Sequence, residues 1–202
     1  KHNDLGVIMS SNLTWSAHLK FISANAYKML GLLRRSFKSS ICPSSKKALY
    51  LSLVRFKLSY CSQIWRPSLL KDIYTIESVQ RRATKFILNN YSSDYKERLL
   101  SLDLLPLMML FELNDILFFV KSYKQPSNAF NILDYVSFSS CPTRSSAHCK
   151  MIHKKASSSS VMHFYFYRLP RLWNSIPVID LSLSYNCIKL KLKQFFWVHF
   201  VN

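Results

Sequence analysis

Apolar residues recur at helical spacing through most of the chain, and this pattern predicts a mainly α fold. The longest run predicts a helix that begins at the capping residue Ser16 and ends near Phe37. Its apolar positions are Leu19, Ile22, Ala26, Met29, Leu30, Leu33 and Phe37. Its opposite face carries Lys20, Lys28, Arg34, Arg35 and Lys38. The helix is therefore expected to pack on one side and to present cations on the other.

Two further helices follow this first one. Pro43 starts a largely apolar helix over about 44–64, and Pro67 ends it. The next helix, 70–89, contains "ESVQRRATKFIL" (77–88), in which Arg81, Arg82 and Lys85 lie off the apolar face. This segment is either a solvated basic face or a surface that binds an anionic partner.

The remaining elements are shorter. Residues 5–15 predict a small β-hairpin, and helices are expected over 94–102, 106–124 and about 184–200. Serine-rich sequence separates the helical body from an aromatic and arginine-rich C-terminal unit. The predicted organisation is a hairpin (1–15), a helical bundle (16–125), a linker (126–160) and a small α-rich unit (161–202).

Residues 99–120 form the most apolar stretch, but they include three carboxylates, Asp103, Glu112 and Asp115. Each carboxylate near a bilayer centre costs about 2.5–3.5 kcal/mol. We therefore expect a buried helix here, and no membrane partner.

The formal net charge is +18, from 28 Lys and Arg against 10 Asp and Glu. A field of this sign favours a polyanion, either nucleic acid or an anionic surface, although a basic face can also be merely solvated. The five cysteines form no compact framework and no secretory signal precedes them, so reduced thiols and an intracellular location, in cytoplasm and nucleus, are expected.

The residue content argues against several kinds of chemistry. Two glycines are too few for a phosphate-binding loop. The carboxylates include no Asp-x-Asp pair, so no catalytic residue and no two-metal centre is predicted in this chain. Cys141, His148, Cys149 and His153 form the one metal-like cluster, but its spacing is poor for zinc. A serine-rich linker is the favoured interpretation, with a zinc site as the alternative.

The candidate nucleic-acid-binding residues combine the basic helix faces with arginines of the C-terminal unit. They are Lys20, Lys28, Arg34, Arg35, Lys38, Arg81, Arg82, Lys85, Arg168 and Arg171. Arg168 and Arg171 alternate with Tyr165, Tyr167 and Trp173, a mixture that suits stacking on unpaired bases but is also common in protein cores.

Six segments in a fixed order resemble one family. They are "DLGVIMSSNLTWSAHL" (4–19), "LGLLRRSF" (30–37), "LYLSLVRFKLSYCSQIWRP" (49–67), "IESVQRRATKFIL" (76–88), "YKERLLSLDLLPL" (95–107) and "FYRLPRLWNSIP" (166–177). Together they resemble the region after the polymerase core in reverse transcriptases of non-LTR retrotransposons, LINE-type elements and especially jockey-like ones.

The resemblance implies a palm–thumb junction at Leu5, Gly6 and Val7, followed by a helical thumb-like domain. It matches Tyr50, Tyr60 and Trp65 to the second thumb helix, and Gln80, Arg81 and Arg82 to a "QRR" motif. Trp173, Asn174 and Pro177 match an "LWN-x-(L/I)-P" element. The implied partners are RNA and DNA as template–primer, and an upstream polymerase core of the same polypeptide.

Two departures from the family pattern limit what the resemblance implies. The catalytic Asp-Asp motif lies upstream in the family and is absent here, so this chain alone is expected to be inactive, with Mg²⁺ expected only in that core. Leu110 and Phe111 replace an arginine pair, which fits a decayed or divergent copy. The alternatives are a helical protein–protein scaffold with solvated basic faces, or a non-functional fragment of a decayed element.

Overall fold

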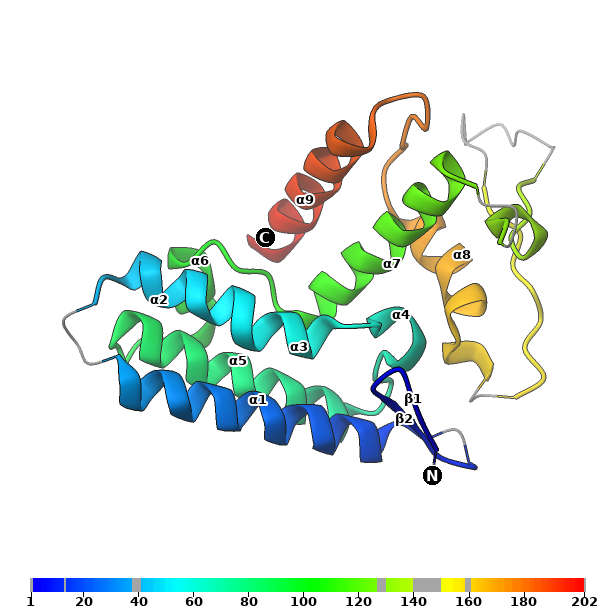
Figure 1. Ribbon diagram of the computed structural model, residues 1–202. Helices are drawn as coiled ribbons and strands as arrows, with labels where there is room; N and C mark the ends of the chain where they lie inside the picture. The colour runs from blue at the N-terminus through cyan, green and yellow to red at the C-terminus, as the bar shows by residue number, and fades with distance from the viewer. Residues whose placement is uncertain are drawn as a thin grey trace. The chain divides into compact units, whose positions relative to one another are not determined.

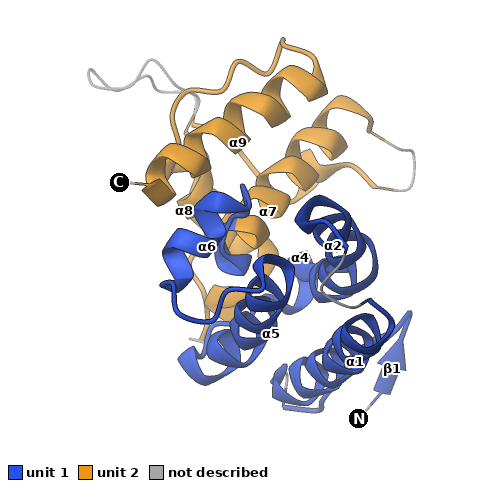
Figure 2. Cartoon of the chain, turned by 90° about the vertical axis from the view of Figure 1, so that its left-hand side faces the viewer, with its two compact units in different colours: residues 1–109 blue, residues 110–202 orange. Residues whose placement is uncertain are grey.

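The computed structural model describes residues 2–12, 14–37, 41–126, 130–139, 150–158 and 161–201. It is mainly helical, with a two-stranded hairpin at its start, as the sequence predicted. Figure 1 shows the order of the elements and Figure 2 the two compact units, residues 1–109 and 110–202.

The N-terminal hairpin pairs β1 (His2–Asp4) antiparallel to β2 (Val7–Met9). Its two-residue loop places Leu5 at φ 46° and Gly6 at φ 86°. Both are positive, as a tight turn of the hairpin type requires, and glycine adopts such angles without strain. The ring of His18 then fastens the hairpin to the first helix, since its Nδ1 accepts a hydrogen bond from the Ile8 amide at 3.2 Å.

Two long helices of unit 1, α1 (Ser16–Ser36) and α5 (Leu70–Leu88), lie side by side (Figure 1). The two helices run in the same direction. The Ser16 hydroxyl donates to Asp72 at 2.8 Å near the start of both helices, and the Tyr27 and Ser78 hydroxyls are 2.6 Å apart further along both. Their facing apolar residues are buried, as the helical periodicity predicted.

The continuous helix expected over 44–64 is divided in the structure. α2 (Pro43–Leu49) passes into a π-helical segment, η1 (Tyr50–Arg55), and then into α3 (Phe56–Ser59). Cys61 adopts a left-handed conformation, φ 53°, before α4 (Ser62–Trp65). The prediction missed this break because the apolar pattern continues through it.

Unit 1 also contains α6 (Tyr95–Ser101), which begins at a complete capping box. The Asp94 carboxylate accepts from the Lys96 amide at 3.0 Å, and Glu97 accepts from the Asp94 amide at 3.3 Å. This start agrees with the expected helix over 94–102.

Helix α7 (Leu107–Lys124) lies mostly in unit 2, although the sequence grouped residues 16–125 as one bundle. Unit 2 continues with two short 3₁₀ turns, η2 (Ile132–Asp134) and η3 (Val161–His163), and ends with α8 (Tyr165–Ser175) and α9 (Tyr185–Val201). Phe119 of α7 and Trp173 of α8 meet at 5.0 Å between ring centroids. Their contact explains the grouping, because α7 supplies apolar surface that the aromatic segment buries.

Within the described residues, the structure has no helix with the length and apolarity that crossing a membrane requires.

Candidate nucleic-acid interface

The cations of α1 and α5 lie on the solvent side of the two packed helices. Lys20, Lys28, Arg34 and Arg35 are exposed on α1, and Arg81 and Arg82 on α5, while Lys85 is half-buried. Lys38 lies outside the described residues. Lys28 and Arg35 lie on a different side of α1, where they line a groove together with Phe56 and Tyr60. We call the other five described cations, Lys20, Arg34, Arg81, Arg82 and Lys85, the α1–α5 basic face.

Arg82 connects the two helices of this face. Its guanidinium carbon lies 4.9 Å from the ring centroid of Tyr27 on α1, and the Tyr27 hydroxyl contacts Ser78. Arg34 follows Tyr27 by seven residues and therefore lies on the same side of α1. The structure thus brings cations of both helices together, which the sequence predicted only on the condition that the helices pack side by side.

Arg81 extends the basic face in the other direction. Its guanidinium carbon lies 4.2 Å from the ring centroid of Tyr95, at the start of α6. Arg81 remains exposed in this contact, so its charge is accessible to solvent and to a ligand. The adjacent arginines therefore diverge from α5, one toward α1 and the other toward α6.

Two exposed residues of α5, Lys71 and Tyr74, lie on this face and were not among the predicted site residues. Their signal was present in the sequence, because Lys71, Tyr74, Ser78 and Lys85 follow one another at three-, four- and seven-residue intervals. An exposed cation and an exposed ring extend the surface toward the start of α5.

Beneath the basic face, Gln80 of the "QRR" segment is fully buried in a polar network. Its amide oxygen accepts from the Tyr50 hydroxyl at 2.9 Å, and its amide nitrogen donates to the Leu105 carbonyl at 3.0 Å and the Tyr95 hydroxyl at 3.2 Å. Gln80 is therefore a structural residue, whereas the two arginines beside it face solvent.

Glu77, one turn before Arg81, is the buried acid of the same network. It accepts hydrogen bonds from the Tyr95 hydroxyl and, at 3.0 Å, from the Leu107 amide. Burial raises the pKa of the Glu77 carboxyl above its usual range, although these donors and the charges of Arg81 and Arg55 oppose the shift.

The π-helical segment η1 explains how Tyr50 and Arg55 both reach this network. Hydrogen bonding from i to i+5 brings residues five apart onto nearly the same side, whereas an α-helix would separate them. Arg55 donates to the Leu105 carbonyl at 3.1 Å, the same oxygen that Gln80 contacts. Burial raises the pKa of the Tyr50 hydroxyl and lowers the pKa of Arg55.

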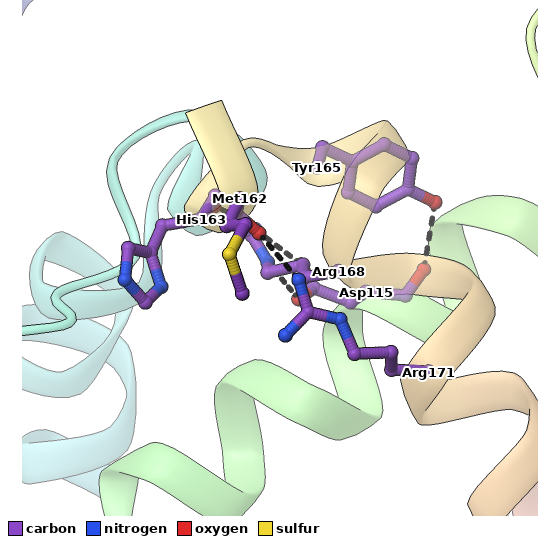
Figure 3. Close-up of polar contacts among 6 residues, drawn as sticks. All are labelled: Asp115, Met162, His163, Tyr165, Arg168 and Arg171. Carbon is purple, nitrogen blue, oxygen red and sulfur yellow. Dashed lines mark hydrogen bonds and ion pairs between the residues drawn. The ribbon is translucent and has the colours of Figure 1, made fainter. Parts of the chain in front are cut away.

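The arginine–aromatic segment of unit 2 has a different arrangement (Figure 3). Arg168 forms an ion pair with the fully buried Asp115, with nitrogen–oxygen distances of 2.8 and 3.0 Å. Arg168 also donates to the His163 carbonyl at 2.6 Å, and the Tyr165 hydroxyl donates to the Asp115 carbonyl at 2.9 Å. The Arg168 guanidinium is thus engaged within its own unit.

The other residues of that segment divide between core and surface. Tyr165 and Trp173 are buried, so their rings stabilise unit 2, the alternative that the sequence left open. Arg171 is exposed and donates to the Met162 carbonyl at 3.3 Å (Figure 3). Of the two arginines predicted here, Arg171 is the exposed one, and it belongs to unit 2 and not to the α1–α5 basic face.

The metal-like cluster lies mainly outside the described residues, which exclude Cys141, His148 and Cys149. His153 is exposed, and one of its ring nitrogens lies 3.2 Å from the Asn174 amide. In the described part of the chain, no group of three or more potential ligands is arranged to hold a metal ion.

Comparison with known proteins gave no match among protein-family models, curated proteins or solved structures.

Proposed function

We propose that this chain is the thumb-like, C-terminal part of a retroelement RNA-directed DNA polymerase, and that it holds an RNA–DNA template–primer through the α1–α5 basic face. The observation that carries the proposal is the contiguity of exposed cations on two packed helices, with Arg82 crossing from α5 to the Tyr27 ring on α1. The choice of an RNA–DNA duplex as ligand rests on the six ordered segments that resemble non-LTR reverse transcriptases.

The role is positioning. Rigid helices that present Lys and Arg to phosphates gain affinity by releasing counterions, and such contacts fix the duplex without reading its sequence. The buried network of Glu77 and Gln80 supports this role indirectly, because it fixes α5 against the segments that carry Tyr50 and Tyr95. Bond formation would belong to catalytic aspartates in an upstream core.

The test is binding of the full 202-residue chain to a labelled RNA–DNA duplex at low and moderate salt. Reversing Arg81, Arg82 and Lys85 to Glu should weaken binding at least tenfold, because it replaces attraction to phosphates by repulsion. The salt dependence should also weaken, since each phosphate contact contributes about 0.9 to the slope of log affinity against log salt. Circular dichroism should show unchanged helix content, because none of the three is fully buried.

A matched control reverses three exposed lysines of unit 2, Lys121, Lys189 and Lys191, which changes the net charge equally. This control should retain most of the affinity. Equal losses in both triple variants would reduce the binding to overall charge and remove the proposed face. Unchanged affinity in the α5 variant would favour the scaffold alternative.

A further inference from the structure

An open groove lies on another side of α1, between α1 and α3, within unit 1. Its volume is about 620 Å³. We call it the α1–α3 groove. The apolar side chains that line it include Phe21, Ile22, Met29 and Leu32 of α1, and Phe56 and Tyr60 at α3. The polar lining consists of Asn25, Lys28, Arg35 and Lys57.

The groove exposes large apolar side chains that folding has not covered. Phe56 is 61% exposed and Leu32 48%, and Phe21 and Tyr60 are similarly accessible. Single exposed apolar residues are ordinary, but a contiguous group around a groove is typical of an interaction site.

The groove also has a one-sided charge. Three cations, Lys28, Arg35 and Lys57, stand among its lining residues, and no carboxylate does. In the described part of the chain, no ion pair involves these three cations. The chemistry that complements them is therefore apolar where it meets the floor and anionic where it meets the edges.

We propose that the α1–α3 groove binds an acidic amphipathic helix of a protein partner. Residues Phe21 to Arg35 of α1 span about 20 Å, a length that matches about four turns of a partner helix. Aliphatic anchors at i, i+4, i+7 and i+11 would lie along the apolar floor, and flanking Glu or Asp would pair with the three cations.

Single-stranded nucleic acid fits the groove less well. Successive bases stack on rings with parallel faces, whereas the rings of Phe56 and Tyr60 are tilted by 53° with centroids 6.4 Å apart. Apart from Phe21, the rest of the apolar floor consists of Ile22, Met29 and Leu32, and the uncharged polar groups of the lining are the Asn25 amide and the Tyr60 hydroxyl. Alkyl side chains of a helix match this surface better.

The test uses fluorescence anisotropy of a labelled peptide of about 15 residues, with leucines at i, i+4, i+7 and i+11 and glutamates on the flanks. It is measured with the full chain and without nucleic acid. A peptide of the same composition with alternating leucines should bind at least tenfold more weakly. Replacing the glutamates by lysines should cause a similar loss, and salt should weaken the glutamate peptide.

Phe56→Glu and, on the opposite wall, Leu32→Glu should each weaken peptide binding at least tenfold. Tyr91→Glu places the same charge at an exposed ring of unit 1 outside both the groove and the α1–α5 basic face, and it should leave peptide affinity unchanged. Phe56→Glu should also retain affinity for the RNA–DNA duplex, so this result is independent of the proposed function.

Three outcomes would overturn the proposal: equal binding of helical and alternating peptides, equal binding of the glutamate and lysine peptides, or full peptide affinity in both groove variants. Displacement of the peptide by oligothymidylate, with Phe56→Glu abolishing oligothymidylate binding, would assign the groove to single-stranded nucleic acid instead.

Discussion

Two segments of this chain combine arginine with tyrosine, and each lies beside a buried carboxylate. The arginines of the two segments nevertheless have opposite roles. In unit 2, Asp115 takes Arg168 as its partner. In unit 1, Glu77 is satisfied by the Tyr95 hydroxyl and the Leu107 amide, which are neutral donors. Arg81, one turn after Glu77, therefore remains at the surface on the Tyr95 ring. For Arg168 and Arg81, the partner of the nearby buried acid accounts for the difference between an arginine that stabilises the fold and one that is available to a ligand.

The largest expected effect comes from removing the acid that engages Arg168. Asp115→Ala leaves a mostly buried guanidinium without its carboxylate, and such a change costs about 3–5 kcal/mol of unfolding free energy. Chemical denaturation followed by circular dichroism measures it. Arg171 lies on the same helix as Arg168 but is exposed, so Arg171→Ala should change the unfolding free energy by no more than about 0.5 kcal/mol. A loss below about 1 kcal/mol in Asp115→Ala would contradict the structural role assigned to Arg168.

The fold was predictable where periodicity and capping agree. α5 and α6 combine a regular apolar face with a clear end or start. α1 followed from its apolar face alone, because the expected cap Ser16 donates to Asp72 and Trp15 occupies the N-cap position. The hairpin was expected over 5–15, whereas its turn is Leu5-Gly6, between β1 and β2. The break at Cys61 was not predictable, because apolar residues continue through it. The grouping of α7 with unit 2 depends on contacts such as Phe119 with Trp173, which join residues far apart in the sequence.

The candidate site was predictable only in part, since sequence shows which residues are charged but not which find partners. Periodicity placed Arg81 and Arg82 off the apolar face, and the structure agrees. The same reasoning could not distinguish Arg168 from Arg171, because the partner of Arg168 lies 53 residues earlier. Gln80 was grouped with its arginine neighbours by motif, yet it is the buried centre of the network.

Unit 1 should be sensitive to acid, because it buries the neutral imidazole ring of His18. Burial lowers the pKa of His18 from 6.5 to about 4. The unfolded chain therefore binds a proton first, and unfolding free energy should fall by about 2–3 kcal/mol as pH drops from 6.5 to 4. Protonation would also remove the Nδ1 acceptor that holds the Ile8 amide.

Denaturation of the wild type and of His18→Gln across this pH range isolates the contribution of that ring. The raised pKa of Glu77 acts in the opposite direction and is common to both proteins, so it cancels in their difference. Parallel stability curves for the two proteins would contradict a buried neutral His18.

A smaller loss is expected when the neutral donor of Glu77 is removed. Tyr95→Phe deletes the hydroxyl that donates to Glu77 and accepts from Gln80, which should cost about 1–2 kcal/mol. The ring under Arg81 remains, so duplex affinity should not change while the protein is folded. Tyr91→Phe, at an exposed tyrosine, is the control and should have no effect. Reduced duplex affinity in a folded Tyr95→Phe protein would show that the network and the surface are not separable.

The smallest effect on stability, and the most direct test of the comparison, is expected for Arg82→Ala. Its contact with Tyr27 is exposed, so the loss should be about 0.5–1 kcal/mol. Its effect on binding should be clearer: the affinity for the RNA–DNA duplex should fall several-fold, and the slope of log affinity against log salt should fall by about 1. Arg82→Lys should keep most of the salt slope, because the slope depends on charge. Arg171→Ala removes an exposed arginine of unit 2 and should change neither the affinity for the duplex nor the salt slope. If Arg82→Ala and Arg171→Ala weakened the duplex equally, the charge of the whole chain would account for binding. The distinction between an arginine engaged by a buried acid and one available on α5 would then concern folding alone.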